Sequence, residues 1–306
     1  MYGTGRNNNK HNVQKQLEDI IVEHYQYQIF IPGGNKTALV FGIDGLKDDI
    51  DRRKIIQDKI IALHEDDTDG EVEQVGFVNV DKSSPQLVMT GGEFCGNATR
   101  TAVAYYLNNC EGEIEIAVSG TSKSLLAGIS SSGTVWSYMP VFEDLSSSII
   151  YVRGGLYWVM IEGISHLIVP QLQSVPYLSK ILECENSNDQ KKIALDLLSK
   201  TINNNSLPHS NSYGIIFLEN IADILKMHPF VYIKTAETAN YETGCGSGAI
   251  CIGLVSSMLF NKNINIPLLQ PSGKIINAEV EYYEDNKVKA KISGVVECKE
   301  KLVMEC

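Results

Sequence analysis

Short apolar runs along the chain predict strands, and they alternate with stretches in which apolar residues recur at helical spacing. In the first half, helical spacing covers 48–64 and the segment that follows Cys95. Strand runs in that half occupy 26–30, 37–43, 74–80, 86–89, 113–118 and 135–139. Strand runs that alternate with amphipathic helical segments are typical of a mixed α/β fold.

The second half of the chain repeats this order. Helical spacing returns at 191–202 and after Cys245, and strand runs occupy 157–161, 167–169, 214–218, 231–235, 280–283 and 288–293. Each half runs from strands through an amphipathic helix to a second helix led by a cysteine, which indicates an internal duplication. The linker-like composition at 140–148 predicts half-domains at 23–143 and 144–292. A polar segment, 1–22, is expected to be disordered or an extension.

The composition restricts the classes of function. The 306 residues carry a formal net charge of −11, which disfavours nucleic acid and anionic membranes, since both are bound by clustered Lys and Arg. No apolar run has the length that crosses a bilayer, and the polar N-terminus lacks the apolar core of a secretory signal. The seven cysteines form no CxxC pair, which favours reduced thiols and a cytoplasmic protein.

Two of the cysteines share a local sequence. Cys95–Asn97 reads Cys-Gly-Asn and Cys245–Ser247 reads Cys-Gly-Ser, and the two cysteines are 245 − 95 = 150 residues apart. Both copies lead into an apolar helical stretch, so each thiol is predicted at a helix N-terminus. Unpaired N–H groups and the helix dipole favour an anion there, which lowers the pKa of a thiol and cradles a carboxylate.

A matched pair of such thiols predicts one kind of chemistry. Thiols from two half-chains can face each other across a ligand, so that one removes a proton from one face of a carbon and the other returns a proton to the opposite face. Two helix N-termini on one carboxylate would also stabilise the charge that develops when an α-proton leaves. The remaining cysteines lack this context and are interpreted as ordinary small residues: Cys110, Cys184, Cys251, Cys298 and Cys306.

Several segments resemble a known group of enzymes. Gly33–Asn35, Cys95–Ala98 and Cys245–Gly248 look like the diaminopimelate epimerase superfamily of cofactor-independent amino acid racemases. Further stretches are most similar to the histidine racemases of staphylopine-type opine metallophore pathways: Glu73–Phe77, Leu87–Thr99, Val118–Gly120, Met139–Pro140 and Gln270–Gly273. Their order and spacing match over residues 25–295.

The resemblance implies a fold of two pseudo-symmetric domains, each a mixed sheet around a central helix, with the active site between them. The last strand, near 293–306, would return to the first domain. Cys95 and Cys245 would be the acid–base pair, acting on a small amino acid without pyridoxal phosphate or metal. The sequence agrees, since it holds no HExxH and no other cluster of His and Cys ligands.

The same resemblance implies the substrate contacts. Backbone N–H groups would hold the substrate carboxylate, at Gly96, Asn97, Gly246 and Ser247. Asn35 would also lie at the substrate. The preferred reaction would convert L-histidine to D-histidine for metallophore synthesis, in a protein for which a homodimer is the expected assembly.

The chain departs from diaminopimelate epimerases in ways that favour another side chain. Thr235–Gly244 lacks the Arg that holds the distal end of the substrate in that family. The family's Gly-Asn-Pro-His stretch reads Gly163–His166 without its Asn, and a later Asn position is Ser212. These changes remove contacts to a second amine and carboxylate.

Three more side chains have both a functional and a structural interpretation. Glu73 is either a solvated residue before a strand or a carboxylate that binds an imidazole or an ammonium group. Glu242, three residues before Cys245, is either a contact for the substrate ammonium or a surface residue at a helix entrance. His166 matches a substrate position of the family, although a strand histidine is more often a satisfied core residue.

Other functions remain open. A diaminopimelate epimerase or a racemase of another amino acid keeps the class and changes the substrate. Isomerases that resemble the phenazine-biosynthesis enzyme use a Glu, which Glu73 matches, but they do not rely on a cysteine pair. A non-catalytic amino acid-binding protein would not need both thiols. Proline racemases and hydroxyproline epimerases carry an Asp shortly before their second cysteine, which Ala239–Glu242 lacks.

Overall fold

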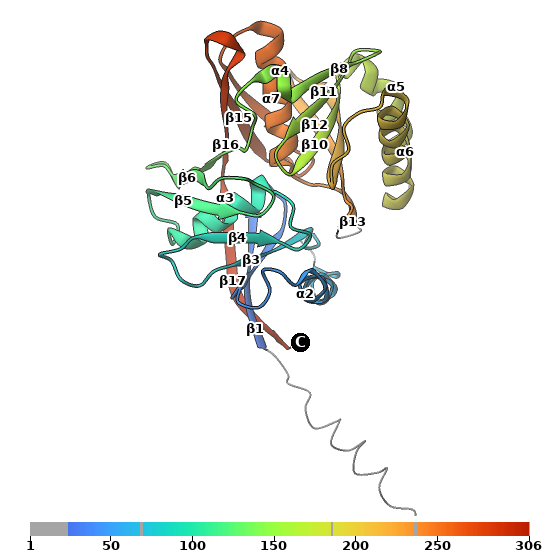
Figure 1. The fold of residues 1–306 in the computed structure, drawn as a ribbon. Helices are drawn as coiled ribbons and strands as arrows, with labels where there is room; N and C mark the ends of the chain where they lie inside the picture. The colour runs from blue at the N-terminus through green and yellow to red at the C-terminus, as the bar shows by residue number, and fades with distance from the viewer. Residues whose placement is uncertain (1–23, 68–69, 185, 236–237, 306) are drawn as a thin grey trace, which may run out of the picture.

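The computed structural model describes residues 24–67, 70–184, 186–235 and 238–305, so the extension predicted at 1–22 lies outside the described residues. The chain forms two halves, the first below the second in Figure 1. The first half contains β1 (His24–Pro32), β2 (Thr37–Phe41), α2 (Ile50–Leu63), β3 (Gln74–Val78), β4 (Gln86–Met89), α3 (Gly96–Tyr106), β5 (Gly112–Val118), β6 (Leu125–Ile129) and β7 (Val135–Tyr138).

The second half begins with the short helix α4 and ends with β16, after which β17 completes the described chain. Its elements are α4 (Leu145–Ser148), β8 (Ile149–Val152), β9 (Leu156–Ile161), β10 (Ile164–Val169), α5 (Gln171–Leu182), α6 (Ser187–Asn205), β11 (Ser212–Ile221), β12 (Ile224–Ile233), β13 (Thr238–Tyr241), α7 (Gly246–Phe260), β14 (Ile264–Leu269), β15 (Ile275–Tyr282), the 3₁₀ turn η1 (Glu284–Asn286), β16 (Val288–Gly294) and β17 (Val296–Glu305).

Strand pairing repeats from one half to the other. In the first half, β1 pairs antiparallel with β2, β2 parallel with β3, β3 antiparallel with β4, and β4 parallel with β5. In the second half, β9, β10, β11, β12 and β14 follow the same succession. Each half then ends in an antiparallel meander, β5–β6–β7 or β14–β15–β16. The internal duplication is therefore visible in the sheet topology.

Two strand pairings join the halves. β16 pairs antiparallel with β7, and β17 pairs antiparallel with β1. Because β17 follows β16 directly in the chain, the red C-terminal strand runs from the second half down beside the blue β1 (Figure 1). The residue boundaries of the half-domains stay a prediction.

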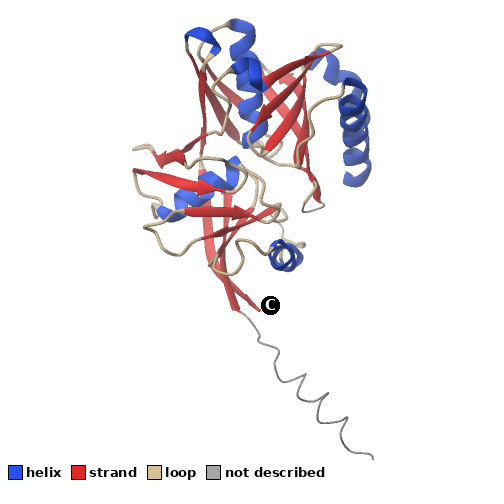
Figure 2. Ribbon diagram, viewed as in Figure 1, coloured by secondary structure: helices blue, strands red, loops and turns tan. Residues whose placement is uncertain are grey.

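A helix fills the centre of each half (Figure 2). α3 packs against β1, β2, β6 and β7, and α7 packs against β9, β10, β14, β15 and β16. Every residue of α7 from Gly246 to Val255 is buried, as expected for a helix that is apolar on all sides. Each half is thus a mixed sheet around a central helix, and the predicted fold class is confirmed.

The sequence-based prediction missed helix α5 and strands β6, β8, β13 and β14. α5 contains Pro176 and exposes Leu172 and Val175, so its apolar residues do not mark one buried face. β14 contains Pro267, which is uncommon inside a strand. β12 begins well before its predicted start at 231, because a tight turn with positive φ at Ala222 and Asp223 folds it back onto β11.

Candidate active site

Cys95 and Cys245 occupy equivalent positions at the start of the two central helices. Each is the N-cap of its helix with an extended backbone, and each sulfur accepts a 3.4 Å hydrogen bond from the N–H group three residues later, at Ala98 or Gly248. The first N–H groups of α3 and α7 have no acceptor within their own helix, and the positive end of the helix dipole lies there. The prediction that both cysteines lead helices is confirmed.

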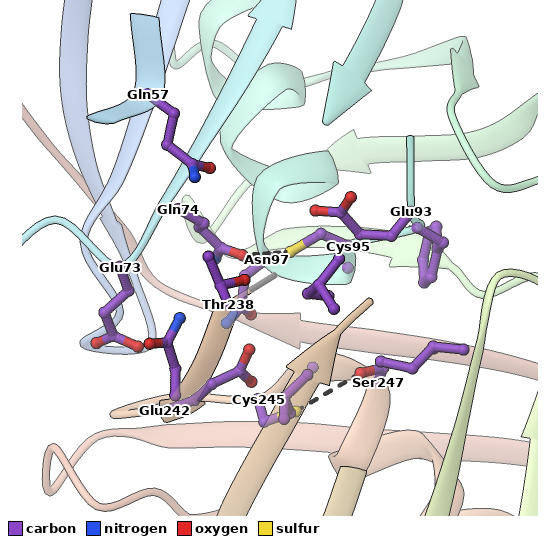
Figure 3. Close-up of a pocket in the computed structure, with 17 residues that line it drawn as sticks. Gln57, Glu73, Gln74, Glu93, Cys95, Asn97, Thr238, Glu242, Cys245 and Ser247 are labelled. Atoms are coloured by element: carbon purple, nitrogen blue, oxygen red, sulfur yellow. Dashed lines mark hydrogen bonds between the residues drawn. The ribbon is translucent and has the colours of Figure 1, made fainter. Parts of the chain in front are cut away.

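Both thiols line one cavity between the halves (Figure 3). The cavity volume is about 40 Å³, room for a few water molecules. Cys245 is 2% exposed, and Cys95 is partly buried. The other lining residues are Gln57, Glu73, Gln74, Glu93, Phe94, Gly96, Asn97, Ile164, Val231, Ile233, Thr238, Asn240, Glu242, Gly246 and Ser247.

Cys95 faces an amide whose orientation is fixed by its neighbours. Its sulfur lies 3.0 Å from Gln74 Oε1, while Gln74 Nε2 donates to Asn35 Oδ1 and, over 3.1 Å, to Thr37 Oγ1. Asn35 Nδ2 donates to the Glu73 carboxylate over 2.7 Å. Because that carboxylate accepts, each amide presents its oxygen to the next donor in the chain. An amide oxygen only accepts, so Cys95 is a thiol that donates to Gln74.

Cys245 has a different set of partners. Its thiol hydrogen-bonds with the Glu242 carboxyl group, and Ser247 Oγ lies 3.5 Å from its sulfur. Ser247 Oγ is also 2.8 Å from Nε2 of His166, whose pKa is lowered to about 3 by burial, so the imidazole is neutral. A carboxylate can accept the Cys245 proton, whereas the amide oxygen of Gln74 cannot. The two thiols are therefore equivalent in backbone position and different in proton chemistry.

Burial shifts the pKa of the acidic groups around the cavity. It raises the pKa of Glu73 to about 7 and that of Glu242 to about 8, and it raises the pKa of Glu93 as well. Burial also raises the pKa of the Cys95 thiol to about 12 and that of Cys245 well above its ordinary value. The expectation that the helix N-terminus lowers the thiol pKa is therefore wrong, because desolvation outweighs the N–H groups.

Asn97 connects the two helix N-termini. Its Nδ2 donates across the halves to Gly244 O over 2.6 Å, and Arg100 Nη2 donates to its Oδ1 over 2.9 Å. Space is tight at this point, since a Cβ on Gly246 would lie 3.2 Å from Asn97 Oδ1 and 2.7 Å from Ile292. Glycine at 246 is therefore needed for the close approach of α7 to α3.

The structure brings most of the predicted site residues to one place. Eight of them line the cavity: Glu73, Cys95, Gly96, Asn97, Glu242, Cys245, Gly246 and Ser247. Asn35 and His166 are not among the lining residues in the described part of the chain; Asn35 orients Gln74, and His166 lies behind Ser247. The structural interpretations of Glu73 and Glu242 as solvated surface residues are wrong, since both side chains are partly buried, line the cavity and have a pKa raised by desolvation.

The carboxylate of Glu73 is already engaged by protein donors. Its oxygens accept from the Asn35 amide, from the Thr243 N–H group over 3.1 Å, and from the Thr243 hydroxyl. Thr243 belongs to the second half and Glu73 to the first, so this carboxylate also links the halves.

Sequence reasoning missed four glutamine and glutamate side chains at the site. Gln57, Gln74 and Glu93 line the cavity, and Gln270 Oε1 accepts from the Cys245 N–H group over 2.9 Å. Gln57 left a detectable signal, because it shares the buried side of a predicted amphipathic helix with Ile56 and Ile60. A polar residue on the core side of a helix has to find a partner or a cavity.

The described residues contain neither a candidate metal site nor a helix that could span a membrane. They contain no group of three or more His, Cys, Asp and Glu side chains placed to share a metal ion. In the same part of the chain, every helix is too short or too polar to cross a bilayer.

The arrangement can transfer protons at a single carbon from two sides. A ligand in the cavity would have Cys95 from the first half and Cys245 from the second as neighbours, with two helix N-termini available for an anionic group. The carboxylates around it would favour a cationic group beside that anion. An ammonium and a carboxylate on one carbon, as in an amino acid, match both features.

Comparisons with known proteins place the chain among histidine racemases. The model of the histidine racemase CntK N-terminal domain matches residues 30–301. A histidine racemase of Fusobacterium nucleatum subsp. nucleatum is 29% identical over 286 residues, covering 87% of this chain and 94% of that protein. Among solved structures, a phenazine biosynthesis protein of the PhzF family from Bacillus anthracis has a TM-score of 0.60 at 14% identity, covering 92% of this chain and 99% of that one.

A second solved structure is a hydroxyproline epimerase from Agrobacterium vitis with bound trans-4-hydroxy-L-proline. It has a TM-score of 0.59 at 11% identity, and the alignment covers 92% of both chains. At these identities the two solved structures show a common fold.

Proposed function

The chain belongs to the histidine racemase family, which makes it an isomerase, and from this we propose that it interconverts L- and D-histidine without pyridoxal phosphate. The observation that carries the proposal is the shared cavity. Cys95 and Cys245 cap equivalent helices of the two halves and line one space. One sulfur removes the α-proton and the other delivers a proton to the opposite face of the same carbon.

The partners of the two sulfurs supply the starting protonation states. Cys95 donates to an amide oxygen and therefore starts as the acid. Cys245 hydrogen-bonds with Glu242, which can take the thiol proton and leave a thiolate as the base. As the Cα–H bond breaks, its proton goes to Cys245, and the Cys95 S–H proton goes to Cα from the other side. The opposite enantiomer uses the sulfurs in exchanged roles.

We assign the substrate carboxylate to the two helix N-termini. Gly96 and Asn97 lie in the first turn of α3, and Gly246 and Ser247 lie in the first turn of α7. Their N–H groups have no carbonyl acceptor within their own helix. Removal of the α-proton moves negative charge onto the carboxylate, so donors at this position stabilise the transition state more than the ground state.

We assign the substrate ammonium to the Glu242 carboxyl group, which lines the cavity. Burial is the main reason why the pKa of both thiols is high; the negative charges of Glu242 and Glu93 raise the pKa of Cys95 further, and that of Glu242 raises the pKa of Cys245. A bound ammonium offsets that charge and lowers the pKa of both thiols. Substrate binding itself would then favour formation of the thiolate.

The wider role follows from the resemblance of the motifs. We propose that D-histidine made by this enzyme enters the synthesis of an opine metallophore in the cytoplasm. A reducing compartment keeps the two cavity thiols free of a disulfide. A homodimer is the assembly we predict.

The test of the proposed function is racemisation by purified protein free of pyridoxal phosphate. L-Histidine is incubated with the wild type, and D-histidine is measured by chiral chromatography, with a panel of other amino acids and meso-diaminopimelate in parallel. Cys95→Ser and Cys245→Ser should each lose racemisation, whereas Cys110→Ser, an exposed cysteine, should retain it. If the protein racemised a different amino acid and not histidine, the enzyme class would stand and histidine would be wrong as the substrate. Unchanged activity in either cavity variant would overturn the proposal.

A further inference from the structure

Two polar side chains of the cavity, Gln57 and Glu93, have no substrate contact assigned to them so far. Gln57 reaches into the cavity from α2, and Glu93 comes from the loop that leads into Cys95 (Figure 3). Both belong to the first half. Neither transfers a proton, binds the substrate carboxylate or ammonium, or takes part in the hydrogen bonds that join the halves.

Gln57 carries an unfilled hydrogen-bond donor. The residue is 5% exposed, and its Nε2 atom is buried without any hydrogen-bond partner in the described structure. A buried amide N–H group without an acceptor is costly, so such groups are rare in native proteins. Their presence at a cavity indicates an acceptor that comes with a ligand.

Glu93 carries an unfilled acceptor. Its Oε2 atom is buried and has no hydrogen-bond partner within the described residues. A Cβ on Gly91 would lie 2.6 Å from this oxygen, so the glycine makes room for the carboxyl group. The Glu93 carboxyl group has backbone hydrogen bonds at Gly91 and Glu93, so Oε2 is the position left for a ligand. Glu73 is bonded to Asn35 and Thr243, and Glu242 to the Cys245 thiol.

The two side chains are held in a fixed relation by Arg53. This buried residue lies on the same helix as Gln57, and its Nε donates over 3.0 Å to Thr90 O, next to the loop that carries Glu93. Its Nη1 also donates to Leu46 O and Lys47 O. α2 is thereby attached to the segment before Cys95, and the unfilled donor and acceptor are positioned together rather than on independent mobile chains.

We propose that Gln57 and Glu93 form the subsite that binds the imidazole ring of the substrate. A neutral imidazole has one ring N–H donor and one ring nitrogen with a lone pair, which match one unfilled acceptor and one unfilled donor. The ring N–H group donates to Glu93 Oε2, and Gln57 Nε2 donates to the other ring nitrogen. Phe94 and Ile233, which also line the cavity, supply apolar surface for the ring.

This arrangement predicts selectivity for histidine over apolar amino acids. A leucine or phenylalanine side chain in the same place would leave both buried polar groups unpaired, whereas a site built on hydrogen bonds rejects a ligand that lacks them. The inference rests on the proposed function, because it names the side-chain contacts of the same substrate.

The experiment combines side-chain truncation with ring methylation. KM and kcat for racemisation are measured with L-histidine and with its two ring N-methyl isomers, in the wild type, Gln57→Leu and Glu93→Leu. Gln171→Leu and Glu111→Leu, at exposed positions, are the matched controls. Each cavity variant should raise KM for histidine about tenfold or more, as expected for the loss of one hydrogen bond in a buried site, and the controls should not.

The methylated substrates separate a binding role from a structural one. Methylation of the nitrogen that faces Glu93 should weaken binding in the wild type, and this penalty should shrink in Glu93→Leu. Methylation of the other ring nitrogen should likewise weaken binding in the wild type, and this penalty should shrink in Gln57→Leu. If a leucine variant has no cooperative thermal transition, Gln57→Met or Glu93→Met takes its place and is scored identically.

The outcomes distinguish this inference from the proposed function. If the wild type racemises histidine but the methylation penalties are the same in all variants, the subsite is wrong and the racemase assignment stands. If the wild type does not racemise histidine, the proposed substrate is wrong, and the proposed imidazole subsite is wrong as well.

Discussion

At the scale of single residues, the site combines equivalent backbone positions with unequal side-chain partners. Both sulfurs accept an N–H group three residues later, but one faces the amide of Gln74 and the other faces the carboxyl group of Glu242. A symmetric pair of thiols with high pKa values would hold two protons and lack a base. The Glu242 carboxyl group removes this symmetry because it can accept one of them.

This account predicts the pH dependence of the Glu242→Gln variant. In the wild type, kcat/KM should rise with pH as the Glu242 carboxyl group ionises, with an apparent pKa near 8. Glutamine cannot accept the Cys245 proton, so the variant should lose this rise and fall roughly 100-fold or more in kcat. Glu111→Gln, at an exposed position, is the control. A variant that keeps both the rate and the pH profile of the wild type would show that Glu242 does not act on Cys245.

Residues whose role is set by local sequence could be predicted, and those set by tertiary contacts could not. A cysteine before glycine and a helical stretch is an N-cap wherever the rest of the chain lies, so Cys95 and Cys245 were predictable. Gln57 and Glu93 come from segments that meet only in the folded chain. The high thiol pKa values were missed for the same reason, since burial is not visible in a local motif.

At the scale of elements, helices α3 and α7 hold the sulfurs through their first turns. Gly248 belongs to the first turn of α7, where its N–H group donates to the Cys245 sulfur. A Cβ there would lie 2.8 Å from Ile216, 2.9 Å from Met227 and 3.2 Å from the Cys245 sulfur. Gly253 lies further along the same helix, where a Cβ would contact Val280 and Ala278 in the core. Helix α7 therefore has one glycine close to the Cys245 sulfur and another that packs in the core.

Replacement of these two glycines by alanine should separate activity from stability. Gly248→Ala should lower kcat at least tenfold, because the methyl group displaces the sulfur or the cap. Gly253→Ala should change the midpoint of thermal unfolding with kcat within about twofold of the wild type, since its contacts are at 3.1 and 3.3 Å in the core. Activity assays and thermal melts of both variants check this. Equal loss of kcat in both would mean that the first turn of α7 has no special role.

Elements were predictable where the local sequence marks them. α3 and α7 stand out because their apolar residues fit a helix and a cysteine marks their start. α5 and β14 were missed because each contains a proline and exposes apolar or polar residues against the expected pattern. Their place in the fold is decided by packing on the sheet rather than by local preference.

At the scale of the whole molecule, the duplication places two copies of one motif at a shared boundary. The same succession of strand pairings occurs in both halves, and the halves are joined through β7–β16 and β1–β17. Hydrogen bonds cross between them at the site itself, from Asn97 to Gly244 and from Thr243 to Glu73. These contacts hold the two halves together around the cavity that both thiols line.

The buried carboxyl groups predict how global stability depends on pH. Glu73 and Glu242 have pKa values raised from 4.5 to about 7 and about 8, so the folded state binds their protons more tightly than the unfolded state. This contribution is fully present below 4.5 and is lost as the pH rises through 7 and 8, by up to about 1.4 kcal/mol per pH unit for each group.

The difference between wild type and variant isolates this effect from other titrating groups. The unfolding free energy in urea should fall more steeply from pH 5 to pH 8 in the wild type than in the double variant Glu73→Gln/Glu242→Gln. Parallel curves for the two proteins would contradict the assignment of these two groups as buried acids.

The central claim is that two sulfurs act on opposite faces of one carbon, and the position of deuterium after a single conversion tests it most directly. L-Histidine is converted in heavy water, the reaction is stopped early, and the two enantiomers are separated and analysed by mass spectrometry. The account predicts deuterium at Cα of the D-histidine product, with the recovered L-histidine unlabelled, because the returned proton comes from the second, solvent-exchanged thiol. Deuterium in recovered L-histidine at the same level as in the product, or a product without deuterium, would indicate a single base and contradict the account.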